Sequence, residues 1–131
     1  MSDESIVIST DRAPRSTSPI SQGIRVGALV FVSGQLGIDP LSMKRVSGGI
    51  AIETEQALRN VKAVLEEAGA SMGNVVKTTC FIASTDDFVV FNEAYAQFFP
   101  GHRPARSTVQ VGLTGGYLVE VEAIAYIPTV E

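Results

Sequence analysis

Hydrophobic positions in the middle of the chain follow a helical period. Six apolar residues recur on one side of a 3.6-residue repeat: Ala57, Leu58, Val61, Val64, Leu65 and Ala68. This stripe predicts an amphipathic helix that buries one face. Glu53 and Glu55 lie in its predicted first turn, where the helix dipole favours anions, and Gly69 follows the last turn as a stop signal.

A second helix is predicted after the segment Thr85-Asp86-Asp87, which supplies a cap and an acidic first turn. Its apolar stripe consists of Phe88, Phe91, Tyr95, Phe98 and Phe99. Pro100-Gly101 is expected to end this helix, because proline does not continue a helix and glycine favours its termination.

Segments rich in β-branched and aromatic residues predict the strands. The first strand segment is 24–32, which is interrupted at Val26-Gly27 and ends at Ser33-Gly34-Gln35. The others are 75–83, 105–113 and 117–127. Residues 9–22 are predicted to form a loop. This order predicts an α+β domain with a mixed sheet and two α-helices on one face. The other face is either solvated or buried against another copy of the chain, and the absence of a third helix favours self-association.

Composition narrows the class of protein. The 131 residues, 45% of them hydrophobic, fit one domain spanning 1–131. The net charge of −4 argues against nucleic acid and membrane partners. The first residues are acidic, where a secretory signal would be basic. A single cysteine, Cys80, in an apolar segment is interpreted as a small core residue, and it favours a reducing, cytoplasmic location.

Most common catalytic motifs are missing from the sequence. The one histidine, His102, has no potential metal ligand at a suitable spacing, so no metal site is expected. No phosphate-binding glycine loop is found, so no nucleotide cofactor is expected either. His102 and Arg103 are predicted to be solvated loop residues.

Two charged positions lie in strands. Glu120 and Glu122 share one face of the last strand, either as part of a solvated face or with one acid held in a cleft for proton transfer. Arg106 follows Pro104, which favours an extended chain. It is either an ion-paired surface residue or a rigidly mounted guanidinium that binds a carboxylate.

Two polar segments have both structural and functional interpretations. Asn92 borders the apolar stripe of the second helix, and on the residues alone a hydrogen bond to a neighbouring loop is favoured. Ser33 and Gly34 end an apolar strand with small side chains. They either allow a ligand to approach the backbone closely or form an ordinary turn.

The sequence as a whole resembles the RidA (YjgF) family. The matching segments occur in order over nearly the whole chain: Ser33-Gly34-Gln35, 56–64, 76–79, 91–95, 103–107 and 119–125. The resemblance implies a chorismate-mutase-like fold, a homotrimer with ligand clefts between subunits, and another strand between the last two.

The resemblance also implies an activity, which is the hydrolysis of enamines and imines such as 2-aminoacrylate and 2-iminopropanoate to 2-keto acids and ammonia. It implies no cofactor and, as partners, a small imino or keto acid and further copies of the chain. By position, Arg106 would bind the substrate carboxylate and Glu120 would orient water. Ser33, Gly34 and Asn92 would line the cleft.

Two positions depart from the family pattern. Ile20 replaces a tyrosine of the entry arm, and Thr108 replaces a frequent cysteine, so substrate preference could shift or the activity could weaken. A non-catalytic binding or regulatory protein of the same fold is therefore an alternative. An RNA-cleaving translation inhibitor is a further alternative, against which the net charge of −4 argues.

Overall fold

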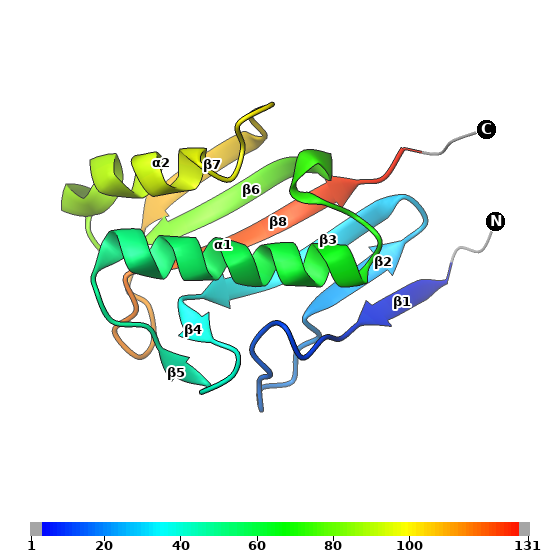
Figure 1. The fold of residues 1–131 in the computed structure, drawn as a ribbon, viewed down its shortest axis with the longest axis horizontal. Helices are drawn as coiled ribbons and strands as arrows, with labels where there is room; N and C mark the ends of the chain where they lie inside the picture. The colour runs from blue at the N-terminus through cyan, green and yellow to red at the C-terminus, as the bar shows by residue number, and fades with distance from the viewer. Residues whose placement is uncertain (1–3, 129–131) are drawn as a thin grey trace.

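The computed structural model describes residues 4–128 and contains a six-stranded sheet that carries both α-helices on one face (Figure 1). The strands are β1 (Ser5–Ile8), β2 (Gly23–Val26), β3 (Leu29–Leu36), β6 (Val75–Ile82), β7 (Ala105–Gln110) and β8 (Val119–Tyr126). The helices are α1 (Ile50–Glu67) and α2 (Phe88–Ala96), and β4 (Ile38–Asp39) pairs with β5 (Lys44–Arg45) beside the sheet.

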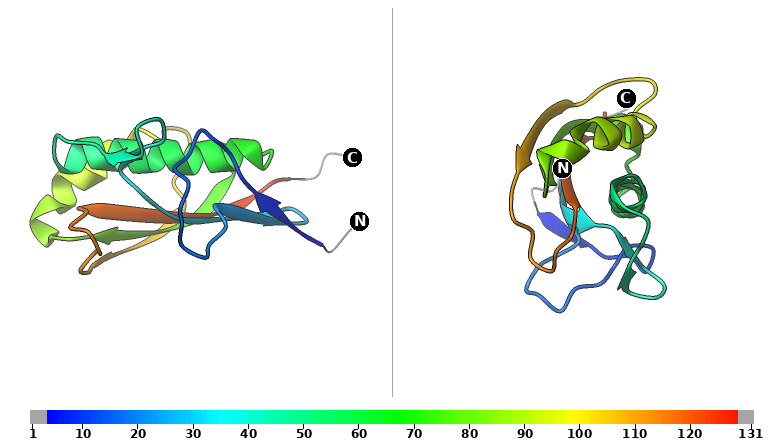
Figure 2. Two further views of the ribbon diagram at one scale, coloured as in Figure 1. Left: turned by 90° about the horizontal axis from the view of Figure 1, so that it is seen from below. Right: turned by 90° about the vertical axis from the view of Figure 1, so that its left-hand side faces the viewer.

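The strand order is β1-β2-β3-β8-β6-β7. Only β6 and β7 run parallel, so the sheet is mixed. Strand β6 lies between β7 and β8, which confirms the inserted strand that the family resemblance implied. Both helices lie on the same side of this sheet in Figure 2, so the predicted α+β layer arrangement is confirmed.

Helix α1 forms as its apolar stripe predicts. Leu58, Val61 and Val64 are buried against the sheet. Gly69 has a φ of 89°, the left-handed conformation expected of a helix-ending glycine. The helix starts at Ile50, so Glu53 lies in the first turn and Glu55 in the second, one turn later than predicted.

Helix α2 is shorter than predicted. Thr85–Asp87 forms a separate 3₁₀ turn, in which the Ser84 side chain accepts a hydrogen bond from the Asp86 amide, and α2 ends at Ala96. Of its aromatic stripe, Phe91, Tyr95 and Phe99 are buried and stack in sequence. In the described part of the chain, no helix has the length and apolarity needed to cross a membrane.

The segment 24–32, predicted to be interrupted at Val26-Gly27, forms a hairpin whose turn lies at that interruption. Gly27, with a φ of 58°, allows the turn between β2 and β3. Strand β3 also continues past Ser33 to Leu36, because a β-bulge between Val32 and Gln35 absorbs the irregular segment. Strand β1 was not predicted, since its four residues gave no distinct pattern.

The face of the sheet opposite the helices carries apolar side chains. Leu29, Phe31, Val109 and Tyr126 belong to this open face and are 39–47% exposed. Exposed apolar groups gathered on one sheet face are typical of a surface that associates with another protein chain.

The buried Glu53 side chain joins α1 to β5 through an ion pair and to the residue before β8 through a hydrogen bond. Glu53 is 1% exposed, and its Oε2 accepts hydrogen bonds from Arg45 Nη2 at 2.7 Å and Nε at 3.1 Å. Its Oε1 accepts a hydrogen bond from the Leu118 amide at 3.0 Å. Both carboxylate oxygens are therefore used, and the backbone two residues before Glu120 is fixed to the helix.

Asn60, two turns further along α1, holds the end of β3. This buried side chain donates hydrogen bonds to the carbonyl oxygens of Leu36 at 3.0 Å and Ile38 at 2.9 Å. Buried polar groups need such partners, so the two helix residues fix the strand ends that carry Gly34 and Glu120.

Replacing Glu53 tests this anchor. Glu53→Ala leaves the partly buried Leu118 amide without an acceptor, whereas Arg45 can turn to solvent, so we expect a loss of about 1–3 kcal/mol of unfolding free energy in urea. Glu55→Ala is the matched control, because its pair with Arg59 is exposed and worth about 0–1 kcal/mol. Equal effects of the two substitutions would contradict the assigned role.

Candidate functional site

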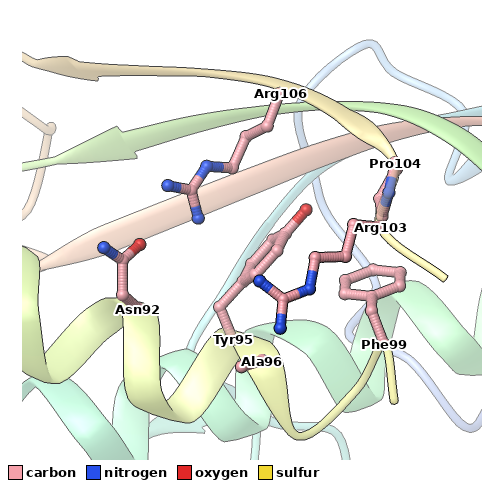
Figure 3. Close-up of a pocket in the computed structure, with 7 residues that line it drawn as sticks. All are labelled: Asn92, Tyr95, Ala96, Phe99, Arg103, Pro104 and Arg106. Carbon is pink, nitrogen blue, oxygen red and sulfur yellow. The ribbon is translucent and has the colours of Figure 1, made fainter. Parts of the chain in front are cut away.

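Two cavities contain the predicted site residues. The first, called the arginine pocket, has a volume of about 300 Å³ and lies between α2 and the start of β7 (Figure 3). Its lining residues are Asn92, Tyr95, Ala96, Phe99, Arg103, Pro104 and Arg106.

Arg106 is held in the arginine pocket by aromatic rings. The guanidinium carbon lies 4.8 Å from the ring centroid of Tyr95, 5.5 Å from that of Phe91 and 5.8 Å from that of Phe88. Such contacts are cation–π interactions and limit the movement of the arginine. Within residues 4–128, Arg106 makes no hydrogen bond or ion pair, so its N–H donors remain available for an anion.

Asn92 and Thr108 lie beside Arg106. Asn92 extends from α2 toward the guanidinium (Figure 3), and Thr108 shares the helix-facing side of β7 with Arg106. Asn92 Oδ1 and Thr108 Oγ1 are both inaccessible to solvent and have no hydrogen-bond partner among the described residues. The predicted link from Asn92 to a neighbouring loop is therefore wrong, and these polar atoms favour a ligand in this region.

The prediction of solvated loop residues is confirmed for Arg103, which is an exposed loop residue, and is wrong for His102. His102 Nε2 contacts the Val75 carbonyl oxygen at 3.0 Å, and its ring packs edge-on against Phe99. Arg103 is exposed but lines the arginine pocket. Phe99, which follows α2, and the Val75 carbonyl oxygen thus fix the His102 ring, which the loop sequence alone could not show.

The second cavity, called the glutamate pocket, has a volume of about 260 Å³ and lies between the N-terminal arm and the ends of β3 and β8. It is lined by Pro14, Ser16, Ser18, Ile20, Gln22, Gly34, Gln35, Leu36, Ile38 and Glu120. Apolar and polar residues contribute about equally to its wall, and Glu120 is the acid among them.

Glu120 packs directly against the backbone of Gly34. A Cβ atom at Gly34 would lie 2.8 Å from the Glu120 carboxylate, so a larger residue at this position would displace the carboxylate. Burial, and secondly the charge of Glu122 on the same strand face, raises the pKa of Glu120. A carboxylate with a raised pKa is a better proton acceptor than an ordinary one.

The N-terminal arm is fastened beside Glu120. Ser33 Oγ donates a hydrogen bond to the Ser21 carbonyl oxygen at 2.6 Å. Gln22 accepts from the Thr10 amide and donates to the Ala13 carbonyl oxygen. These bonds hold Ile20 at the glutamate pocket, where its side chain is 57% exposed. Ser33 therefore has a structural role in fixing the arm.

Arg106 and Glu120 lie on opposite faces of the sheet. In the strand register, Arg106 aligns with Thr78, which is buried beneath the helices and hydrogen-bonded to Tyr95. Glu120 aligns with Phe81, three residues further along β6 and hence on the opposite face. The strand spacing and rise separate the two Cα atoms by roughly 14 Å. One chain therefore does not bring both side chains to one small molecule.

Tyr95, Arg103 and Gln22 are among the cavity residues that sequence reasoning did not assign to a site. Tyr95 was predicted as core, and it is, but it also stacks on Arg106. Arg103 carried no signal, because its pocket depends on the fold. Gln22 was placed in a loop, and its role as a clamp depends on hydrogen bonds that only the folded arm makes.

Within residues 4–128, the cysteine, histidine and acidic side chains provide neither a metal site nor a reactive thiol. Cys80 is buried as predicted, and burial raises its pKa to about 11, so the thiol stays protonated at neutral pH. Among residues 4–128, no cluster of three His, Cys, Asp or Glu side chains could hold a metal ion.

Comparison with known proteins gives consistent matches. The human 2-iminobutanoate/2-iminopropanoate deaminase is 46% identical over 120 residues, which is 91% of this chain and 88% of that protein. The crystal structure of RidA from Psychrobacter sp. PAMC 21119 superimposes with a TM-score of 0.89 and is 41% identical, covering 93% of this chain and 99% of that one. E. coli TdcF with bound serine gives a TM-score of 0.90 at 38% identity, covering 94% and 99%.

The family resemblance predicted from the sequence is confirmed by these relatives and by a family model. The model described as Endoribonuclease L-PSP matches residues 10–127, which is almost the whole of the described chain. The chain therefore belongs to the Endoribonuclease L-PSP family, which is the RidA (YjgF) family.

Proposed function

We propose that the chain hydrolyses reactive 2-enamino and 2-imino acids to 2-keto acids and ammonia. The observation that carries this proposal is the Arg106 guanidinium, fixed over aromatic rings but without an anionic partner in the described chain. The deaminase names of relatives about 45% identical support the same reaction.

Arg106 would bind the substrate carboxylate with two parallel hydrogen bonds. A guanidinium presents donors in a planar fork that matches a carboxylate. The unpaired Thr108 Oγ1 would donate a hydrogen bond to the bound carboxylate, whereas Asn92 Oδ1, which can only accept, would accept one from the N–H of the imine or enamine. Fixing the carboxylate orients the C=N carbon toward an attacking water, which is a positioning effect.

Glu120 would activate that water. Its carboxylate accepts a proton as the water oxygen bonds to C2 of the imine. Glu120 returns this proton to the nitrogen, which gives a carbinolamine with a hydroxyl and an amino group on C2. The hydroxyl proton then passes to the amino group, the C–N bond breaks, and ammonia leaves as the carbonyl of the keto acid forms. Gly34 has no side chain that would displace the Glu120 carboxylate from the glutamate pocket. Ile20 contributes an apolar side chain to the wall of this cavity.

The complete site would form between copies of the chain. Because Arg106 and Glu120 lie on opposite faces of one sheet, the arginine pocket of one copy would meet the glutamate pocket of another. The exposed apolar residues of the open face support such association, and we propose a homotrimer with a cleft between each pair of subunits. The cytoplasmic location inferred from the sequence stays a prediction.

Ligand binding without catalysis is the second candidate. The serine bound in the TdcF structure favours it, because it shows a relative of the same fold holding a small amino acid. Ile20 in place of the family's tyrosine also favours it, since a phenol hydrogen bond is lost. Binding of 2-keto acids without acceleration of imine hydrolysis would select this candidate.

Arg106→Ala tests the carboxylate contact. The loss of two charge-assisted hydrogen bonds should lower kcat/KM for 2-iminopropanoate by about 100-fold or more, after subtraction of spontaneous hydrolysis. The imine is generated from alanine by an amino-acid oxidase, and keto acid release is measured. Arg59→Ala on α1 is the matched control. Unchanged turnover by an intact Arg106→Ala oligomer would overturn the proposal.

The raised pKa of Glu120 predicts a pH dependence. The base acts as the carboxylate, so kcat/KM should fall as the pH drops through a pKa above the usual range of glutamate. Glu122→Gln removes a charge that raises this pKa, and the acidic limb of the profile should move to lower pH. Glu55→Gln should leave the limb in place. A limb that does not move in an intact Glu122→Gln oligomer would contradict the role of Glu120.

A further inference from the structure

The arginine pocket contains a second guanidinium, that of Arg103. If Arg106 binds the only carboxylate of the substrate, Arg103 has no anion to bind. Arg103 and Arg106 both line the cavity, and Figure 3 shows both side chains extending from the β7 side toward α2. No aspartate or glutamate belongs to the lining. Two like charges thus face one space without a counterion from the described chain.

These two arginines differ from all the others in the chain. Five of the seven arginines donate hydrogen bonds to a carboxylate or a backbone carbonyl: Arg12, Arg15, Arg25, Arg45 and Arg59. Within residues 4–128, Arg103 and Arg106 make no such bond. The arginines that lack a partner are therefore the pair that shares the arginine pocket.

We propose that Arg103 forms a second anion subsite and that the preferred substrates are 2-imino acids with a second carboxylate at the end of the side chain. This inference rests on the proposed function, because Arg106 takes the first carboxylate. The second carboxylate then pairs with Arg103 across the cavity. The volume of about 300 Å³ lies at the lower end of small-molecule sites, which suits a dicarboxylic acid of four or five carbons.

The cavity between the two guanidinium groups suits such a side chain. Tyr95, Ala96 and Phe99 line the space and would contact its methylene groups. The Tyr95 hydroxyl is hydrogen-bonded to Thr78 Oγ1 at 2.7 Å, so the ring presents its apolar surface. A substrate with an uncharged side chain would leave Arg103 without an anion.

The test compares imines made by oxidases from glutamate and from alanine. For the native chain, kcat/KM should be higher for the glutamate-derived imine. Arg103→Gln should lower the ratio of the two kcat/KM values by about 10- to 100-fold, the usual effect of losing a hydrogen bond between charged groups. Arg103→Lys should restore part of the ratio, and Arg59→Gln should leave it unchanged.

Calorimetry with keto acids separates this inference from the proposed function. Native protein should bind 2-oxoglutarate more tightly than 2-oxobutanoate, and Arg103→Gln should remove the difference even if no imine is turned over. Equal binding of the two acids by native protein, or a preference that survives Arg103→Gln, would overturn the subsite. Dissociation of the Arg103→Gln oligomer would assign Arg103 to a subunit contact and would also overturn it.

Discussion

The alternation of side chains along a β-strand is the constraint on which the proposed site depends. Arg106 aligns through β6 with residues beneath the helices, whereas Glu120 aligns with residues of the open face. No change of rotamer moves a strand side chain to the other face of a sheet. A reaction that needs both groups therefore needs two copies of the chain, so catalysis would depend on association of the subunits.

Helix α1 contributes to this site although it lines neither the arginine nor the glutamate pocket. Its buried polar residues Glu53 and Asn60 fix the backbone of Leu118 and Leu36, at the ends of the strands that carry Glu120 and Gly34. The apolar stripe of α1 packs against the sheet, and Glu53 and Asn60 fix the positions of the strand ends. A general base needs such support, because a small displacement of the water that it activates lowers the reaction rate strongly.

The helices could be predicted because their signals are local. The stripe through Leu58 and Val61 and the stop at Gly69 are confirmed, as is the mixed sheet with both helices on one face. The insertion of β6 between β7 and β8 is a long-range pairing, and only the family resemblance indicated it. The place of Arg103 in the arginine pocket could not be predicted for the same reason, since that pocket is created by the packing of α2.

Mixing two inactive variants tests the central claim most directly. Arg106→Ala and Glu120→Gln should each be inactive alone, and refolding them together in equal amounts places an intact arginine and an intact glutamate at some subunit boundaries. For sites shared between neighbours in a ring, roughly a quarter regain both groups, so about that share of native imine hydrolysis should return. If each site lay within one chain, no mixed oligomer would hold a complete site, and the absence of recovered activity in verified mixed oligomers would contradict the account.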